Sequence, residues 1–339
     1  LNSDNGDIWD SGKTLSDQSV QIAIGGKQLS SDTKYFWKVK VWDKEGKESA
    51  WSKTSFFTTG LLSTNDWKAK WIGLDKSVGS DAPTAKHSVM SARYLRKEPE
   101  VKKELKRATA FICGVGLYEL YINGNKIGDA VLAPNLAEYK KRVYYNTYDV
   151  TEVLKKGKNA IGVILGGGRW VALRPREDPE KPYKAKFPKL LAQINLEYAD
   201  GSKEVIISDE SWKITTNGPI RANNEFDGEY YDATKEMPGW DKVGFNDAKW
   251  SKVQLVSPAA PAVVAQINPP IKVMETLKPV SVKEIKKGVW IYDMGQNMVG
   301  WVKIKVNGSK GTTVKLRFAE TIKEDGSLYM DNLRSAKVT

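Results

Sequence analysis

Alternating apolar and polar residues recur along this chain in short runs, and most runs end at a turn sequence. In residues 34–42 the large apolar side chains Tyr35, Trp37, Val39 and Val41 occupy every second position. A period of two is typical of a β-strand that buries one face. The run therefore predicts a strand, with the turn sequence that follows it closing a hairpin.

Similar runs fill the middle of the chain. Asn123-Gly124 and Asp200-Gly201 are two-residue sequences that favour hairpins, because Asn and Gly tolerate positive φ. Residues 151–155 suggest a single helical turn. The strand-like runs cover residues 107–115, 117–122, 143–148, 159–165, 189–198, 204–208 and 212–216. Their number and spacing favour a jelly-roll β-sandwich in this part of the chain.

The two ends of the chain have the same character. Pro258, Pro261, Pro269 and Pro270 indicate extended connections before the last group of runs. Further strands are predicted at residues 7–16, 56–59, 289–294, 299–306 and 313–319. The whole chain is therefore predicted to be all-β, with several β-sandwich or jelly-roll domains.

Length and composition fit this picture. A chain of 339 residues is long enough for two or three domains. Its 28 Gly, 14 Tyr and 12 Trp residues suit short strands joined by turns. No run of about 18 apolar residues occurs, so we expect no membrane span. The first residues show no signal peptide, which predicts either a cytoplasmic protein or a processed or truncated one.

The net charge of +12 raises the question of nucleic-acid binding. However, the lysines are spread along the chain, mostly as single residues between apolar ones. The densest basic run, residues 96–106, is interrupted by Glu98, Glu100 and Glu104. We therefore predict a solvated lysine-rich surface and no nucleic-acid partner.

The single cysteine and single histidine limit the chemistry that the chain can perform. One cysteine cannot form an intrachain disulfide. Cys113 lies in the apolar run 110–115, which predicts a buried strand residue. His87 lies in a segment rich in Ser, Pro and Lys, which is typical of a loop. Together they argue against a tetrahedral zinc site.

The most informative motifs lie between residues 117 and 150. The turn Ile122-Asn123-Gly124 is followed by Gly128-Asp129, by Leu132-Ala133-Pro134 and by the sequence YYNTYDVT from Tyr144 onward. In this order the motifs resemble the N-terminal, non-catalytic region of bacterial α-L-rhamnosidases, glycoside hydrolases similar to family 78. The same family pattern is seen in WKAKWI at residues 67–72, DGEYYDA at 227–233 and YDMGQN at 292–297. The resemblance covers essentially the whole chain.

The resemblance implies four parts. Residues 1–60 resemble a fibronectin type III-like module that is truncated at its start. Residues 61–90 form a linker and the first strand of a β-sandwich. Residues 91–253 form the jelly-roll domain, and residues 254–339 form a β-sandwich that precedes an (α/α)6 catalytic domain. In this arrangement the strand near Trp71 would pair with the last part, and the jelly roll would be an insertion.

The resemblance also implies what the chain does not contain. Glycosidases need two carboxyl groups that flank the scissile bond, and in this family they lie in the helical barrel that follows. We therefore expect no catalytic residue here and no activity from this polypeptide alone, although the parent protein would be an α-L-rhamnosidase. The implied partners are that barrel and a rhamnose-containing glycan, outside the cell or in the periplasm. The alternative is a structural scaffold without sugar affinity.

Carbohydrate sites combine aromatic faces with carboxylates and amides that bind hydroxyl groups. In some relatives the middle domain binds rhamnose through calcium, which prefers oxygen ligands; here Asp129 is the calcium candidate. The residues that the resemblance suggests for sugar binding are Asp129, Asn135, Glu138, Trp170, Asp227 and Glu229.

Each candidate also has a structural interpretation. Asp129 would cap a turn, Asn135 and Glu138 would be solvated loop residues, Trp170 would be a packing lid, and Asp227 and Glu229 would fix a domain edge. Two departures count against calcium. Asn135-Leu136 stands where many relatives have Gly-Trp, and residues 171–186 are rich in Arg, Lys and Pro.

Overall fold

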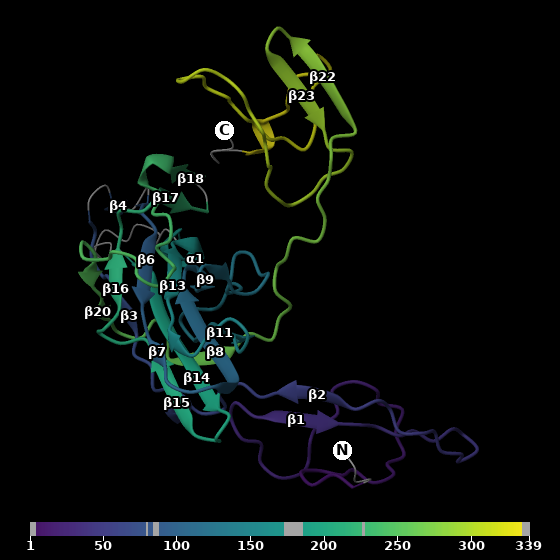
Figure 1. Ribbon diagram of the computed structural model, residues 1–339. Helices are drawn as coiled ribbons and strands as arrows, with labels where there is room; N and C mark the ends of the chain where they lie inside the picture. The colour runs from purple at the N-terminus through teal and green to yellow at the C-terminus, as the bar shows by residue number, and fades with distance from the viewer. Residues whose placement is uncertain (1–4, 79–80, 84–87, 173–185, 226–227, 334–339) are drawn as a thin grey trace, which may run out of the picture.

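The computed structural model of the protein describes residues 5–78, 81–83, 88–172, 186–225 and 228–333 (Figure 1). Nearly all regular structure in these residues is β-strand, so the prediction of an all-β chain is confirmed. The α-helix of the described part is the single turn α1 (Gly168–Ala172). Three 3-10 turns are also described: η1 (Thr64–Asp66), η2 (Ala233–Lys235) and η3 (Asp331–Leu333).

Two large sheets form the centre of the molecule, which we call the body (residues 72–265). The first is antiparallel, with the strands in the order β10 (Asn125–Lys126), β9 (Leu117–Ile122), β13 (Ile161–Gly166), β6 (Arg93–Lys97), β16 (Lys213–Thr215) and β19 (Ser251–Lys252). The second has the order β20 (Gln254–Leu255), β3 (Ile72–Gly73), β14 (Lys189–Tyr198), β8 (Leu105–Val115), β11 (Arg142–Asp149) and β21 (Ala262–Ala265), with β15 (Lys203–Ile207) also paired to β14.

The remaining strands of the described residues form short two-stranded sheets. They are β1 (Lys34–Trp37) with β2 (Ser55–Thr58), β4 (Ala82–Pro83) with β5 (Ser88–Val89), β7 (Glu100–Val101) with β12 (Gly157–Lys158), β17 (Ile220–Asn224) with β18 (Gly228–Tyr231), and β22 (Ser281–Lys286) with β23 (Val289–Asp293). Among the described residues, no helix has the length and apolarity that crossing a membrane requires.

The hydrophobic core follows from the alternation along β8. Ala110 and Ile112 face the six-stranded sheet and pack with residues such as Leu120 and Val163. The residues between them, Phe111 and Cys113, point to the opposite face and join a second cluster that contains Tyr145 and Trp170. The predicted burial of Cys113 is confirmed, and this burial raises the pKa of its thiol. The seven-stranded sheet therefore buries both of its faces.

The first part of the chain is attached to the body through Asp32 and Leu61. The carboxylate of Asp32 lies 2.9 Å from the guanidinium of Arg107 and accepts a 2.9 Å hydrogen bond from Asn195 Nδ2. The amide of Leu61 donates to the Tyr145 hydroxyl at 2.8 Å. Gly60 is needed beside it, because a Cβ there would lie 2.2 Å from the Tyr145 hydroxyl oxygen. Side chains of β8, β11 and β14 thus attach the first part of the chain to the body.

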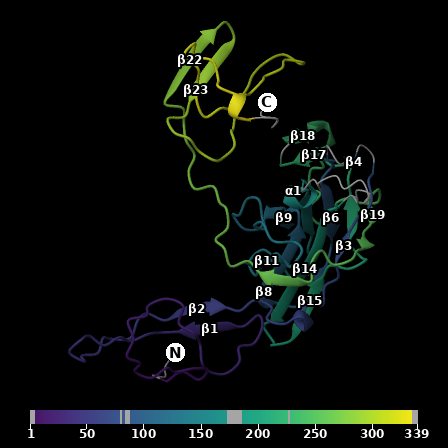
Figure 2. The ribbon, with the colours of Figure 1, turned by 180° about the vertical axis from the view of Figure 1, so that it is seen from behind.

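The two ends of the chain extend away from the body in different directions, as both ribbon views show (Figures 1 and 2). The strand predicted at residues 289–294 is confirmed as β23. The structure differs from the prediction at residues 7–16, 299–306 and 313–319, which form no strand. A ladder needs a run of backbone hydrogen bonds to a neighbour. Among the described residues, residues 299–306 and 313–319 have no strand partner, and residues 7–16 accept one such bond, from the amide of Lys27 to the carbonyl of Ile8 at 3.0 Å.

The strand next to Trp71 does pair with the predicted last part, but only with its first residues, where the amide of Val256 also donates to the carbonyl of Trp71 at 3.0 Å. β3 bonds to β14 and β20, while β22 and β23 bond to each other. Only Gln254–Leu255 of the predicted last part therefore pairs with β3. β20 and β21 lie just after the predicted boundary at 253/254 and extend the seven-stranded sheet. The four domain ranges themselves stay predictions.

Replacing Phe111 by Ala tests the second core cluster. The Phe111 ring is fully buried, with its centroid 6.0 Å from that of Tyr145. Removing a buried phenylalanine ring leaves a cavity and costs about 3–5 kcal/mol of unfolding free energy. Urea unfolding should show this loss for Phe111→Ala, whereas Phe56→Ala, at an exposed position of β2, should change little. Equal effects of the two variants would contradict this description of the core.

Candidate functional site

The loop that follows β10 contacts a segment far away in the sequence, residues 266–272, which we call the strap. Asp129 forms an ion pair of 2.7 Å with Lys272. Beside it, Ala130 forms an antiparallel β-bridge with Lys272, and the amide of Val131 donates to the carbonyl of Ile271 at 2.8 Å. The end of the strap therefore lies antiparallel to this loop at an isolated β-bridge.

Gln266 is the centre of the polar contacts at the start of the strap. Its Oε1 accepts hydrogen bonds from the backbone amide of Asn135 at 2.9 Å and from Asn146 Nδ2 at 3.1 Å. Its Nε2 donates to the carbonyl of Asn268. Asn135 makes a second contact, because its Nδ2 donates to the carbonyl of Pro269 at 3.1 Å. Two of the predicted sugar ligands, Asp129 and Asn135, thus share the strap as their partner.

The charge at Asp129 is compensated by a cation. The hydrogen bond from Lys272, reinforced by its positive charge, holds the pKa of the Asp129 carboxyl below its usual range. The pair is solvent-accessible, since Asp129 keeps 72% of its side-chain surface exposed. Among the described residues, no group of three or more His, Cys, Asp and Glu side chains is arranged to hold a metal ion. Calcium at Asp129 stays a prediction.

Trp170 contacts Tyr139, which is the sequence neighbour of Glu138. Glu138 forms an exposed ion pair of 3.2 Å with Lys141. The Tyr139 and Trp170 rings form a T-shaped pair with a centroid distance of 5.0 Å. The Trp170 indole nitrogen donates to the carbonyl of Phe187 at 2.9 Å, and Lys186 Nζ lies 4.5 Å from the ring. Trp170 is buried, and its polar atom is satisfied within the protein.

Glu229 lies on a different hairpin, β17–β18, where the backbone pairs it with Asn223. The residue is exposed, yet desolvation of its carboxyl, followed by the nearby charge of Glu119, raises its pKa. Asp227 lies outside the described residues. The six predicted residues therefore do not form one constellation in the described part: two contact the strap, two flank Tyr139, and Glu229 stands apart.

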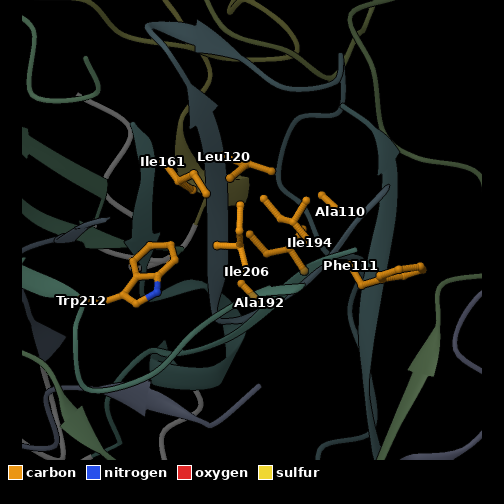
Figure 3. A pocket seen from close by; sticks show the side chains of 9 residues that line it. Ala110, Phe111, Leu120, Ile161, Ala192, Ile194, Ile206 and Trp212 are labelled. Atoms are coloured by element: carbon orange, nitrogen blue, oxygen red, sulfur yellow. The ribbon is translucent and has the colours of Figure 1, made fainter. Parts of the chain in front are cut away.

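The cavity shown in Figure 3 lies within the core between the two sheets. Its lining is apolar and includes Ile112, Leu120 and Ile194 from the facing sheets. The one polar atom of these side chains, Trp212 Nε1, donates to the carbonyl of Ile207 at 2.9 Å. A hydroxyl-rich ligand would find no hydrogen-bonding partner there, so we interpret the cavity as a packing gap.

The sequence analysis did not identify Gln266 and Lys272, the strap residues that bind the loop containing Asp129 and Asn135. The prolines at 269 and 270 indicated an extended connection but carried no information about which loop it would follow. A contact between residues more than 130 positions apart depends on the path of the folded chain, which no local pattern encodes.

Comparison with known proteins places the chain in a family. The chain belongs to the α-L-rhamnosidase N-terminal domain family, whose model matches residues 103–275. A model of a Rha78A-like N-terminal immunoglobulin domain matches residues 1–63, and one of the bacterial α-L-rhamnosidase concanavalin-like domain matches residues 283–339. The fibronectin type III assignment of the first part stays a prediction.

Individual relatives extend the match over almost the whole chain. An α-L-rhamnosidase from Formosa agariphila is 41% identical over 99% of this chain, and one from Alteromonas sp. (strain LOR) is 36% identical over 99%. The solved α-L-rhamnosidase from Dictyoglumus thermophilum is 43% identical over 96% of this chain and 36% of its own, with a TM-score of 0.83. The chain spans 36% of the length of these curated relatives.

A further solved relative is the Streptomyces avermitilis α-L-rhamnosidase complexed with L-rhamnose. It is 28% identical, with a TM-score of 0.85, and the match covers 97% of this chain and 47% of that chain. The all-β arrangement described above is thus shared with the N-terminal portion of solved α-L-rhamnosidases.

Replacing Gln266 by Ala should loosen the strap. The substitution leaves the Asn135 amide and the Asn146 side chain without their acceptor, and an unsatisfied, partly buried donor costs about 1–3 kcal/mol. Urea unfolding, together with faster amide exchange at Val131, would detect the loss. Gln28→Ala, at an exposed position of the first part, is the matched control. Unchanged exchange at Val131 would argue against Gln266 as the centre of these contacts.

The Asp129–Lys272 pair predicts a step in the pH dependence of the strap. Because the pKa of Asp129 is lower in the folded protein, the pair contributes fully above the ordinary aspartate pKa of about 3.9 and is lost as the pH falls through the lowered value. The amide NMR signal of Val131, followed on acidification, should shift in that acidic window. In Lys272→Met the shift should move up toward the ordinary aspartate pKa. An identical titration in both proteins would exclude Lys272 as the cause.

Proposed function

We propose that this chain is the non-catalytic N-terminal region of an α-L-rhamnosidase and that it supports the catalytic part of that enzyme. The observation that carries the proposal is the pair of coverage values for the Formosa agariphila relative. The match includes 99% of this chain but only 36% of that α-L-rhamnosidase. Most of such an enzyme therefore lies outside the matched region.

The contacts of the body support a scaffold role. Asp32 and Tyr145 fix the first part of the chain, and Gln266 and Lys272 fix the strap that leads to the last part. These contacts come from strands or loops of one sheet assembly, so the body holds two outgoing segments in defined positions. A domain that orients neighbouring domains depends on such fixed attachments more than on a ligand pocket.

Rhamnose binding by this region is the second candidate. A relative with a TM-score of 0.85 was solved in complex with L-rhamnose, which makes this sugar the ligand to test. Glu229 supports the idea most directly, since its carboxyl carries a raised pKa beside Glu119. Asp129 and Asn135 support it least, because they already bind the strap. We therefore favour the scaffold as the primary role.

The chain alone should not hydrolyse a chromogenic α-L-rhamnoside, because its described residues contain no helical barrel, the part that the family resemblance associates with the catalytic carboxyl groups. The full-length Formosa agariphila relative serves as the active control. Hydrolysis by the chain at a rate comparable with that control would overturn the division of labour proposed here.

Isothermal calorimetry with L-rhamnose separates the two candidates. The scaffold role predicts no binding heat, either with calcium or with a chelator. Heat that disappears on chelation would establish a calcium-dependent sugar site and favour Asp129. Heat that survives chelation but is lost in Glu229→Gln, and not in Glu138→Gln, would place the sugar on the β17–β18 hairpin.

A further inference from the structure

The β1–β2 pair in the first part of the chain has an inner and an outer face (Figure 1). Tyr35 and Phe57 stand opposite each other in the register, and their rings stack with centroids 5.6 Å apart. Both residues are half-buried, and the Tyr35 hydroxyl accepts a 2.7 Å hydrogen bond from the amide of Ser30. The side on which these two rings lie is therefore the inner face of the pair.

The outer face carries two further aromatic rings. Because side chains alternate along a strand, Phe36 points away from the side that holds Tyr35. Phe56 is its cross-strand partner, and the two ring centroids are 6.2 Å apart. Phe36 is 53% exposed and Phe56 is 60% exposed. Two adjacent rings on an outer sheet surface form an apolar patch, and such patches with a polar rim are characteristic of interaction sites.

A lysine ammonium group lies against this pair of rings. Lys34 Nζ is 3.8 Å from the centroid of the Phe56 ring and 5.4 Å from that of Phe36. Both distances are within the range of a cation–π contact. Among the described residues Lys34 forms no ion pair, so no carboxylate compensates its charge there. The rings thus hold a cation at the edge of an apolar surface.

The same combination of lysine and aromatic ring continues beyond the end of β1. The amide of Ser52 donates to the carbonyl of Val39 at 2.8 Å, so the chain stays paired after Trp37. Lys38 Nζ and Lys40 Nζ lie 4.5 Å and 4.8 Å from the centroid of the Trp51 ring. The outer surface, which we call the cationic–aromatic face, is formed by Lys34, Phe36, Lys38, Lys40, Trp51 and Phe56.

We infer that the cationic–aromatic face binds an acidic glycan, a chain of sugar rings that carry carboxylate groups. The apolar faces of the sugar rings pack on Phe36 and Phe56, and the ammonium group of Lys34 pairs with a sugar carboxylate. Binding here is separate from the proposed scaffold role, because the first part is attached to the body through other residues, Asp32 and Leu61.

Charge and family membership select this ligand. Glu48 pairs with Lys40 at 3.4 Å and so offsets one of the three lysine charges of the face. A neutral glycan would offer Lys34 no counter-charge, whereas an acidic one complements it. A single-stranded nucleic acid would also combine stacking with negative charge. The chain belongs to a family named for an enzyme that acts on a sugar, which favours the glycan.

Fluorescence anisotropy with an end-labelled oligogalacturonate, a simple uronate chain, tests the inference on the 339-residue chain. The oligomer should bind in about 0.01 M salt and more weakly in about 0.15 M, where charges are screened over a shorter distance. The same oligomer with its carboxylates reduced to alcohols should bind at least about tenfold more weakly. Equal binding of the two oligomers would overturn the acidic character of the ligand, and no binding of either would overturn the site.

Paired substitutions locate the binding, because a chain with a net charge of +12 attracts any polyanion at low salt. Lys34→Gln should weaken oligogalacturonate binding by about threefold or more. Lys287→Gln, in the exposed turn between β22 and β23, removes the same charge elsewhere and should have no such effect. Equal losses in the two variants would show that net charge alone is responsible and would overturn the site.

The aromatic contribution has its own test. Phe56→Ala should weaken oligogalacturonate binding by about threefold to tenfold but leave the binding of labelled polyphosphate, which has no sugar ring, unchanged. Val41→Ala, at an exposed position of the inner side, is the matched control, and urea unfolding reports that each variant remains folded. Unchanged oligogalacturonate binding in Phe56→Ala overturns the inference. Tighter binding of a labelled single-stranded oligonucleotide that is lost in Phe56→Ala overturns it in favour of nucleic acid.

Discussion

The antiparallel pairing of β8 with β14 is the constraint on which the rest of the structure depends. The two strands are in register from Lys189 opposite Val115 to Leu196 opposite Ala108 and beyond. Because side chains alternate, this one ladder supplies Ala110 and Ile112 to the core between the sheets and Phe111 and Cys113 to the cluster behind. A shift by one residue would exchange the two sets, so that side chains of the wrong size would enter both clusters. The neighbouring strands β3, β11 and β15 are placed by this ladder.

Much of this arrangement could be predicted from the sequence, because strand periodicity and turn residues are local properties. The runs at 107–115, 117–122 and 189–198 coincide closely with β8, β9 and β14. Local properties failed where strand formation depends on a neighbour. Residues 299–306 have the right alternation but no partner among the described residues, so they form no ladder. The parallel pairing of β11 with β21 was equally invisible, since it joins segments about 120 positions apart.

The candidate site shows the same division between residue type and residue environment. Carboxylates and amides in turns are correct residue types for sugar or ion ligands, and the sequence identified Asp129 and Asn135 on that ground. Their environment comes from the strap, which supplies a lysine ammonium to one and a carbonyl to the other. The Trp170 ring likewise has the right chemistry for stacking on a sugar, but its indole N–H donates to the carbonyl of Phe187 and its ring forms a T-shaped pair with Tyr139. Composition of a loop therefore defines what it can bind, and the fold decides what it does bind.

Tyr145 attaches both the first part of the chain and the strap to the body. Its side-chain hydroxyl accepts from the amide of Leu61, and its backbone carbonyl accepts from the amide of Gln266 at 2.9 Å. The first part of the chain and the strap are thus tied to a single residue of β11. The two attachments therefore share one anchoring residue, so a substitution that displaced Tyr145 would disturb both of them at once.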